Sequence, residues 1–175
     1  IEKYKQELFW REFYNCILFH FPKSEFENFN GAKVKWNQNI EYFQAWCDGK
    51  TGIDIIDAAM QNLNETGTMP NRLRMIVASF LTKNLLIDWR FGEQYFAKKL
   101  LDFETSSNVG SWQWSASTGA DAAPYFRVFN PITQGQKFDP NNDFVKRNLK
   151  YKTSKPIVDI KSSAKAAIEA FSKAK

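Results

Sequence analysis

Apolar side chains recur at intervals of three and four residues through much of this sequence, and that period belongs to helices. Between Thr51 and Gly67 the apolar positions would share one helix face: Ile53, Ile56, Ala59, Met60 and Leu63. After Pro70 a second set repeats the pattern: Leu73, Ile76, Val77, Phe80 and Leu81. No stretch of useful length alternates apolar and polar residues as a half-buried strand does. The sequence therefore predicts an all-α fold.

Breakers and caps set the expected helix boundaries. Thr51 and Asp54 resemble the start of a capping box, and Gly67 would end that helix. The predicted helices cover residues 2–20, 38–48, 51–67, 70–88, 92–102, 121–127, 140–150 and 161–174. The last of these is expected to be peripheral. The polar stretch 103–119 breaks every periodic pattern and is predicted to be a loop, packed against a neighbour through Trp112 and Trp114.

The first predicted helix has two chemically different faces. Phe9, Phe13 and Cys16 fall together and are expected to face the core. The opposite side combines charge, aromatic rings and a hydroxyl group: Glu7, Trp10, Arg11 and Tyr14. Opposite its apolar stripe and near its start, the helix that begins near Pro70 presents Asn71, Arg72, Met75 and Ser79. Faces of this kind are unusual for purely solvated helices, and we expect them to bind something.

The reactive residues exclude several classes of function. His20 is the only histidine, so the sequence offers neither a histidine-based metal site nor a hydrolytic serine or cysteine with a histidine partner. Cys16 and Cys47 are too few for a disulfide scaffold or a metal cluster, and a reducing cytoplasm is the expected location. No glycine-rich phosphate loop is present. Any catalysis would therefore depend on an organic cofactor.

Charge and aromatic content favour a polyanionic partner without requiring one. Lys and Arg number 24 against 19 Asp and Glu, a net charge of +5, and no apolar run approaches the roughly 20 residues of a membrane span. Among six tryptophans, Trp46 is assigned to the core. Trp10 and Trp114 could instead form a base-stacking platform beside three polar donors: Arg11, Asn71 and Arg72.

Charged residues in and around the predicted loop leave two interpretations open. Asp102, Glu104 and Asp121 could be solvated charges or helix caps, whereas Asp102 with Asn108 could bind the ribose hydroxyls and ring amides of a cofactor. Three cations could be surface charges or could hold a phosphate or carboxylate: Arg74, Arg127 and Lys137.

Four ordered runs carry a family resemblance: WREFYN (10–15), GKTGIDIIDAAM (49–60), NRLRMIVASFLTKNLLIDWRFGEQYF (71–96) and GSWQWSASTGADAAPYFRVFNP (110–131). They closely resemble the helical FAD-binding domain of DNA photolyases and cryptochromes, above all the class I cyclobutane pyrimidine dimer photolyases. The resemblance implies a multi-helix orthogonal bundle in a light-dependent DNA-repair enzyme. Its active cofactor would be reduced FAD, which, when excited by blue light, passes an electron to a flipped-out dimer.

The resemblance also implies that residues 1–175 are the C-terminal portion of a longer monomeric protein. An antenna domain, with any antenna chromophore, and the first helices of the flavin domain would lie outside this sequence. The portion alone is therefore expected to be inactive.

The same resemblance implies roles for particular residues. Trp10 and Trp114 would line the dimer pocket, Glu7 would bond a thymine edge, and Met75 would contact the dimer. Further DNA contacts are implied at five positions: Arg11, Tyr14, Asn71, Arg72 and Gln134. On the flavin side the matching residues are Arg74, Asp102, Phe103, Glu104 and Asn108. A chain of readily oxidised indoles would photoreduce the flavin: Trp112, Trp89 and Trp36.

Two departures and two alternatives accompany this interpretation. Thr68-Met69-Pro70 replaces the family's usual Trp-Met-His, so the pocket lacks the histidine that repair of the (6-4) photoproduct needs. The stretch between Phe144 and Pro156 is much shorter than usual. A cryptochrome-like photoreceptor would keep the flavin and the tryptophan chain but would signal instead of repairing. A helical nucleic-acid-binding module would bind DNA without catalysis.

Overall fold

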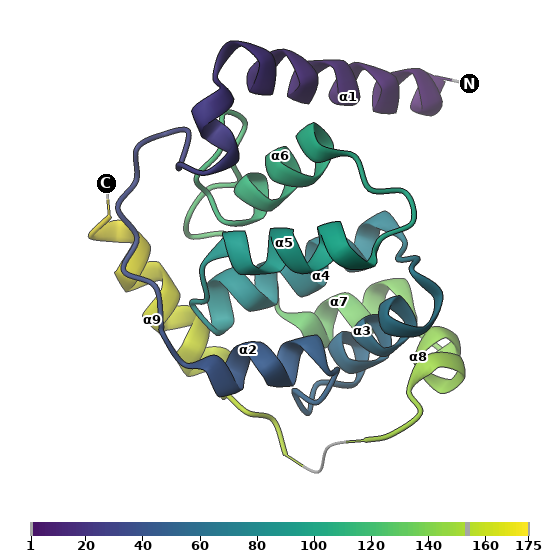
Figure 1. The fold of residues 1–175 in the computed structure, drawn as a ribbon. Helices are drawn as coiled ribbons and strands as arrows, with labels where there is room; N and C mark the ends of the chain where they lie inside the picture. The colour runs from purple at the N-terminus through teal and green to yellow at the C-terminus, as the bar shows by residue number, and fades with distance from the viewer. Residues whose placement is uncertain (1, 153–154, 175) are drawn as a thin grey trace.

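The computed structural model describes residues 2–152 and 155–174, and every regular element in these ranges is a helix (Figure 1). The α-helices are α1 (Glu2–His20), α2 (Ile40–Cys47), α3 (Asp54–Thr66), α4 (Asn71–Ser79), α5 (Trp89–Lys99), α6 (Thr105–Ser115), α7 (Pro131–Phe138), α8 (Asp143–Asn148) and α9 (Ile160–Ser172). A 3-10 helix, η1 (Pro22–Glu25), and a π-helix, η2 (Phe80–Asn84), complete them. The all-α prediction is confirmed. Over these ranges, no helix combines the length and apolar character needed to cross a membrane.

The core forms where α2, α3, α4, α5 and α6 pack together. Both apolar stripes predicted from the sequence are buried there, on α3 and on α4 with the start of η2. Trp46 of α2 is fully buried, as expected, and its indole N–H donates to the Val77 carbonyl at 3.1 Å. Its ring meets Phe96 at 6.1 Å and Trp112 at 6.0 Å between centroids. Apolar area removed from water, at about 25 cal/mol per Å², is the main stabilising contribution.

The start of α3 differs from the prediction. The expected capping box of Thr51 and Asp54 does not form, because Ile53 precedes the first turn and has no side-chain cap. The buried Asp57 carboxylate instead accepts hydrogen bonds from the Thr51 backbone and hydroxyl, at 2.7 and 2.6 Å, and from the Gly52 N–H at 2.9 Å. Burial raises the pKa of Asp57, and the bonds from Thr51 and Gly52 oppose that shift. Asp57 therefore holds the loop that leads into α3.

The predicted helix over 70–88 divides into two elements. α4 ends at Ser79, and the chain continues as one wider turn, η2, before non-helical residues that include Leu86 at φ 53°. Ser79 was expected on the open side of this helix, but it is buried, and its hydroxyl accepts a hydrogen bond from the Phe129 N–H at 3.4 Å. The loop that precedes α7 thus covers a face that periodicity alone left open.

The predicted loop over 103–119 contains α6, so that prediction was wrong. The Glu104 carboxylate accepts hydrogen bonds from the Ser106 and Ser107 N–H groups, each at 2.9 Å. These bonds satisfy donors that the start of a helix leaves unpaired. α6 packs on both α1 and α5, and this packing overrides the weak helix propensity of its serines and glycine.

The chain after α6 also differs from expectation. Residues 121–127, predicted to be helical, contain only turns and irregular backbone. α7 was not predicted, although its signal is present: the Asn130 side chain accepts from the Ile132 N–H at 3.0 Å, and Pro131 occupies the first turn. α8 lies inside the predicted 140–150 helix. The shortened stretch between 144 and 156 includes two positions, 153 and 154, outside the described residues.

α9, expected to be peripheral, covers η2. Its Ala167 and Phe171 are buried. The Lys83 ammonium of η2 lies 3.3 Å from the centroid of the Phe171 ring and donates to the Ser117 hydroxyl at 2.8 Å. Burial lowers the pKa of Lys83 to about 7. On its other side the Phe171 ring meets Trp36 edge-on at 5.7 Å. α9 therefore closes the interior around a buried cation.

α1 lies across the top of the molecule above α6 (Figure 1). None of its residues is buried, so the predicted core-facing stripe was wrong: Phe9 is 74% exposed, Cys16 is exposed, and Phe13 is only half-buried. The helix attaches through a neighbouring face. The Tyr14 ring rests on Gly110 of α6, where an added Cβ would lie 2.1 Å from a ring atom. α1 thus presents most of its side chains outward.

Candidate functional site

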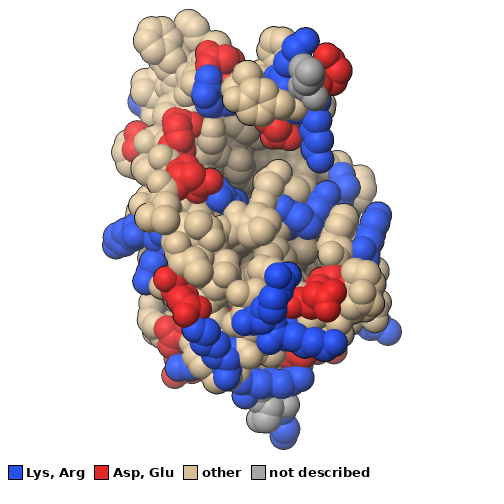
Figure 2. Space-filling view, turned by 90° about the vertical axis from the view of Figure 1, so that its right-hand side faces the viewer, with Lys and Arg blue, Asp and Glu red and all other residues tan. Residues whose placement is uncertain are grey.

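An open hollow of about 600 Å³ separates α1 from the segment that follows α6. Its walls are Gln6, Phe9, Trp10, Phe13, Ala120 and Asp121. The face shown in Figure 2 is hollowed below the helix at the top. Trp10 is 40% exposed, and its ring meets Phe13 edge-on at 5.7 Å. One wall of the hollow is therefore flat, aromatic and reachable.

Trp114 approaches the same segment from α6. Its carbonyl accepts a hydrogen bond from the Ala123 N–H at 3.2 Å, two residues beyond Asp121 of the hollow. The half-buried Trp114 ring meets Phe129 at 6.4 Å, and the Arg127 guanidinium lies 5.6 Å from that same Phe129 ring. Trp10 therefore shares the hollow with Ala120 and Asp121, whereas Trp114 reaches the same segment through its backbone and packs its ring on Phe129.

The remaining predicted residues of α1 fall into two kinds. Glu7 and Arg11 are exposed and can reach a ligand in solvent. Tyr14 is half-buried against Gly110, and its position beside α6 is a packing contact. Burial raises the pKa of Tyr14, and the charge of Asp121 raises it further, so the phenol remains protonated at neutral pH.

A polar rim extends along α4 and α7, which contact each other. Asn71 and Arg72 are exposed at the start of α4, and the Arg72 guanidinium lies 4.3 Å from the Phe138 ring of α7. Gln134 of α7 and Met75 of α4 are half-buried. Lys and Arg side chains gather over the lower half of the face in Figure 2. The structure therefore places three of the predicted DNA-contacting residues on adjoining helices, namely Asn71, Arg72 and Gln134.

The predicted flavin-binding residues surround the link between α5 and α6. The Arg74 guanidinium bonds both Asp102 oxygens, at 3.0 and 2.8 Å, and donates through Nε to the Met69 carbonyl at 2.7 Å. Phe103 is 39% exposed. Glu104 has a role of its own, because its carboxylate caps α6. Burial acts to raise the pKa of Glu104, but its hydrogen bonds outweigh burial and the pKa is lowered.

Asn108 is held by a carboxyl group that the sequence analysis did not single out. Its amide nitrogen donates to the Glu93 side chain at 2.9 Å and to the Glu93 carbonyl at 3.1 Å. The amide oxygen is therefore directed away from Glu93. Burial raises the pKa of Glu93, and the bond from Asn108 opposes that shift. In the sequence, Glu93 stands out only by its place four residues after Trp89, which puts both side chains on one face of α5.

Of the three predicted electron-transfer tryptophans, Trp112 and Trp89 are buried and Trp36 is half-buried. Trp112 packs against Gly92 of α5, where an added Cβ would lie 2.2 Å from the indole ring. Gly92 is one turn after Trp89, and both indoles are buried. Beside the half-buried Trp36, the Asn37 N–H donates to the Leu86 carbonyl at 2.7 Å, three residues before Trp89. Segments next to these tryptophans thus contact one another, and exposure rises from Trp112 and Trp89 to Trp36.

A comparison with known proteins identifies the family. Residues 4–151 match the model of the FAD binding domain of DNA photolyase. The chain belongs to the DNA photolyase family. Within the described parts of this photolyase-family domain, no group of three or more His, Cys, Asp and Glu side chains could hold a metal ion.

Relatives of the photolyase family match over most of the chain. A deoxyribodipyrimidine photo-lyase of Vibrio cholerae is 58% identical over 144 residues, which cover 81% of this chain and 31% of that protein. A class III photolyase from Agrobacterium tumefaciens superimposes with a TM-score of 0.94 and 41% identity, over 99% of this chain and 42% of that one. A Synechocystis cryptochrome superimposes with a TM-score of 0.89 and 30% identity, over 97% of this chain and 41% of that one. The chain spans about a third of the length of the curated photolyases it matches.

Proposed function

We propose that the protein to which this chain belongs reverses cyclobutane pyrimidine dimers in DNA, by light-driven electron transfer from reduced FAD. The observation that carries this proposal is the exposed Trp10 ring on the wall of an open hollow, beside the segment that the Trp114 backbone bonds at Ala123. Indole faces stack on bases of any sequence, each stacked base contributing about 1–3 kcal/mol. A pyrimidine dimer pairs and stacks poorly, so extruding it from the duplex costs less than extruding a normal base.

The polar residues around the two indoles would hold the damaged strand. Glu7 would accept a hydrogen bond from a thymine edge, and the Met75 thioether would contact the dimer. Arg11 and Arg72 are exposed guanidinium groups, which suit phosphate oxygens. Asn71 and Gln134 would add hydrogen bonds along the rim of α4 and α7, and the Tyr14 hydroxyl would add one from α1. The net charge of +5 supports binding that weakens as salt rises.

The chemistry of the flavin-side residues fits FAD. Arg74 and Asp102 offer a cation and an acceptor for ribose or ring groups, and Phe103 offers an exposed ring. Asn108 presents an amide oxygen, fixed by Glu93, to a ring N–H. Glu104 would act through the start of α6, which it caps. When bound, FAD would supply the transferred electron after absorbing light.

The three ordered indoles would supply electrons from outside. Trp112 and Trp89 are shielded from water, whereas Trp36 is half-buried and can exchange with solvent-borne reductants. This arrangement would restore the active, reduced cofactor whenever it becomes oxidised. The same route would serve a photoreceptor, which is the second candidate because the chain is also similar to a cryptochrome.

A repair assay on the full-length protein tests the proposal. FAD-loaded, reduced protein is mixed with an oligonucleotide that carries one thymine dimer, and products are separated after blue light and after darkness. We expect intact thymines only in the illuminated sample. Bound flavin that photoreduces without repair would favour the photoreceptor. DNA binding without any bound flavin would favour a non-catalytic binding module.

A further inference from the structure

The indole N–H of Trp89 has an acceptor whose orientation is unambiguous. It donates to Asn28 Oδ1 at 2.8 Å, and Asn28 Nδ2 donates to the Ala32 carbonyl at 2.6 Å. An indole N–H can only donate and a carbonyl can only accept, so the amide of Asn28 can take only this orientation. Trp89 itself is 0% exposed. Its one proton-bearing polar atom therefore faces a neutral amide oxygen and no water.

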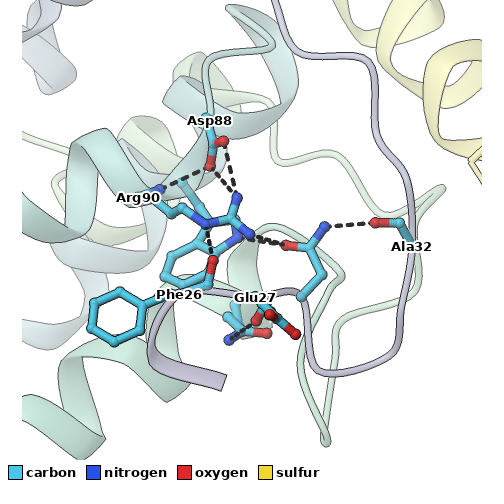
Figure 3. Close-up of polar contacts among 8 residues, drawn as sticks. Phe26, Glu27, Ala32, Asp88 and Arg90 are labelled. Atoms are coloured by element: carbon cyan, nitrogen blue, oxygen red, sulfur yellow. Dashed lines mark hydrogen bonds and ion pairs between the residues drawn. The ribbon is translucent and has the colours of Figure 1, made fainter. Parts of the chain in front are cut away.

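Charged groups lie close to the same indole but are bound to one another. The Arg90 guanidinium lies 4.8 Å from the Trp89 ring centroid. Its Nη1 donates to both Asp88 oxygens at 3.0 Å, and Asp88 also accepts from the Arg90 backbone at 3.1 Å. Arg90 Nε donates to the Phe26 carbonyl, and Figure 3 shows Arg90 held between Asp88 and Phe26. The Asp88 carboxylate, which could act as a base, is thus bonded to Arg90 and does not accept from the Trp89 indole N–H.

Arg90 completes the arrangement around the acceptor. Its Nη2 lies 3.4 Å from Asn28 Oδ1, the same oxygen that Trp89 uses. A cation beside this oxygen lowers its basicity further. It also disfavours a lasting positive charge on the adjacent ring, because a cation over an aromatic face is attracted by the ring's electrons and repelled by a hole.

We propose that Asn28 is a positioning residue that keeps the proton on Trp89 while an electron passes through that ring. The inference rests on the proposed tryptophan route. An oxidised indole is a far stronger acid than the neutral ring, and once its proton leaves, the neutral radical no longer accepts an electron readily. Asn28 stabilises the charged ring through a hydrogen bond but is too weak a base to take the proton. The type of residue at position 28 therefore decides whether the oxidation passes from Trp89 to Trp36.

The step balances in electrons and protons. Trp89 gives one electron to oxidised Trp112 and becomes a radical cation with its N–H bond intact. Trp36 then gives one electron to Trp89, which returns to a neutral indole. Trp36 is half-buried, and its radical cation can release a proton to water. The net change is one electron moved from Trp36 to the photoexcited, oxidised flavin that began the sequence.

The test uses the full-length protein loaded with oxidised FAD, and follows the tryptophan radicals by transient absorption after a laser flash. Asn28→Asp places a base at the same point. We expect the deprotonated radical of Trp89 to become the long-lived product and oxidation of Trp36 to be lost. At acidic pH, where the introduced carboxyl group is protonated, the wild-type products should return. A purely structural role for Asn28 would not produce this reversal.

Asn30→Asp is the matched control. It makes the same change of charge in the same loop, where Asn30 donates to the Ser117 carbonyl at 3.0 Å instead of accepting from Trp89. We expect it to behave like the wild type. Ultraviolet resonance Raman spectra of the flavin-free protein report the indole N–H hydrogen bond and show whether each variant keeps it. Asn28→His supplies a second base if Asn28→Asp fails to fold.

The outcomes separate the two proposals. If either basic variant keeps the indole hydrogen bond and still oxidises Trp36 as the wild type does at neutral pH, the role of Asn28 is overturned. Trp89→Phe should abolish photoreduction of the flavin. If Trp89→Phe photoreduces normally, the tryptophan route itself fails, whatever Asn28 does.

Discussion

α1 and α3 are both well-formed helices, but the fold uses them in opposite ways. Of the 13 residues of α3, eight are buried, whereas none of the 19 residues of α1 is. The polar residues inside α3, such as Asp57 and Gln61, are fully engaged with nearby backbone. Those on α1 remain at the surface beside exposed rings. α1 therefore offers exposed candidate ligand contacts although it contributes no buried residue to the core.

The largest expected effect is on the free energy of unfolding, which should fall much more for a change in α3 than for one in α1. Leu63→Ala in α3 removes a fully buried side chain and should lower the free energy of unfolding by about 2–5 kcal/mol. Phe9→Ala in α1 removes a ring that is 74% exposed and should cost under about 0.5 kcal/mol. Urea unfolding of the full-length variants measures both. Equal losses would mean that a part of the protein outside this chain buries α1.

The next prediction concerns DNA binding, where changes at exposed or half-buried tryptophans should matter more than a change in the core of α3. Trp10→Ala, and separately Trp114→Ala, should weaken binding of dimer-containing DNA by about 1–3 kcal/mol, because each removes one stacking surface. Leu63→Ala should leave the affinity of the folded protein unchanged. Fluorescence anisotropy with damaged and undamaged oligonucleotides measures the difference. The same loss on undamaged DNA would contradict a dimer-specific role.

The last prediction concerns how the free energy of unfolding depends on pH, and it compares the buried amine of Lys83 with the exposed guanidinium of Arg11. Lys83 has a folded pKa of about 7 against a reference value of 10.5, so between these pH values the unfolded chain binds more protons. The free energy of unfolding should therefore rise from pH 7 to pH 9, and Lys83→Met should remove that rise. Arg11→Ala should leave it intact, because Arg11 is exposed. Denaturant titrations across this pH range provide the measurement, and an identical pH slope in the Lys83 variant would refute the assignment.

The sequence predicted those features that burial dictates through a regular spacing. The stripes of α3 and α4 are examples, because each apolar position there has to face the core. α6 escaped prediction because Glu104 and its packing partners create a helix that serines and glycine do not favour alone. The apolar stripe of α1 misled because Gly110 admits Tyr14 on a neighbouring face. Local periodicity carries no information about such partners.

The candidate site shows the same division. Its residue types were recognised from the sequence through a family resemblance, and the approach of Trp10 and Trp114 to one segment needed the tertiary structure. The contact between Asn28 and Trp89 joins positions 61 residues apart, and no local pattern announces it. Glu93 was missed for a similar reason, since its importance lies in the amide it holds.

Because Gly110 has no side chain, the distance between α1 and α6 depends on a single position of the backbone. A single methyl group there would lie 2.1 Å from the Tyr14 ring, so that ring, or α1 with it, would have to shift relative to α6, while every side chain that lines the hollow would keep its identity. Clearance and chemistry are thus controlled at separate positions. One carbon atom on α6 could therefore change how α1 sits without replacing any residue that lines the hollow.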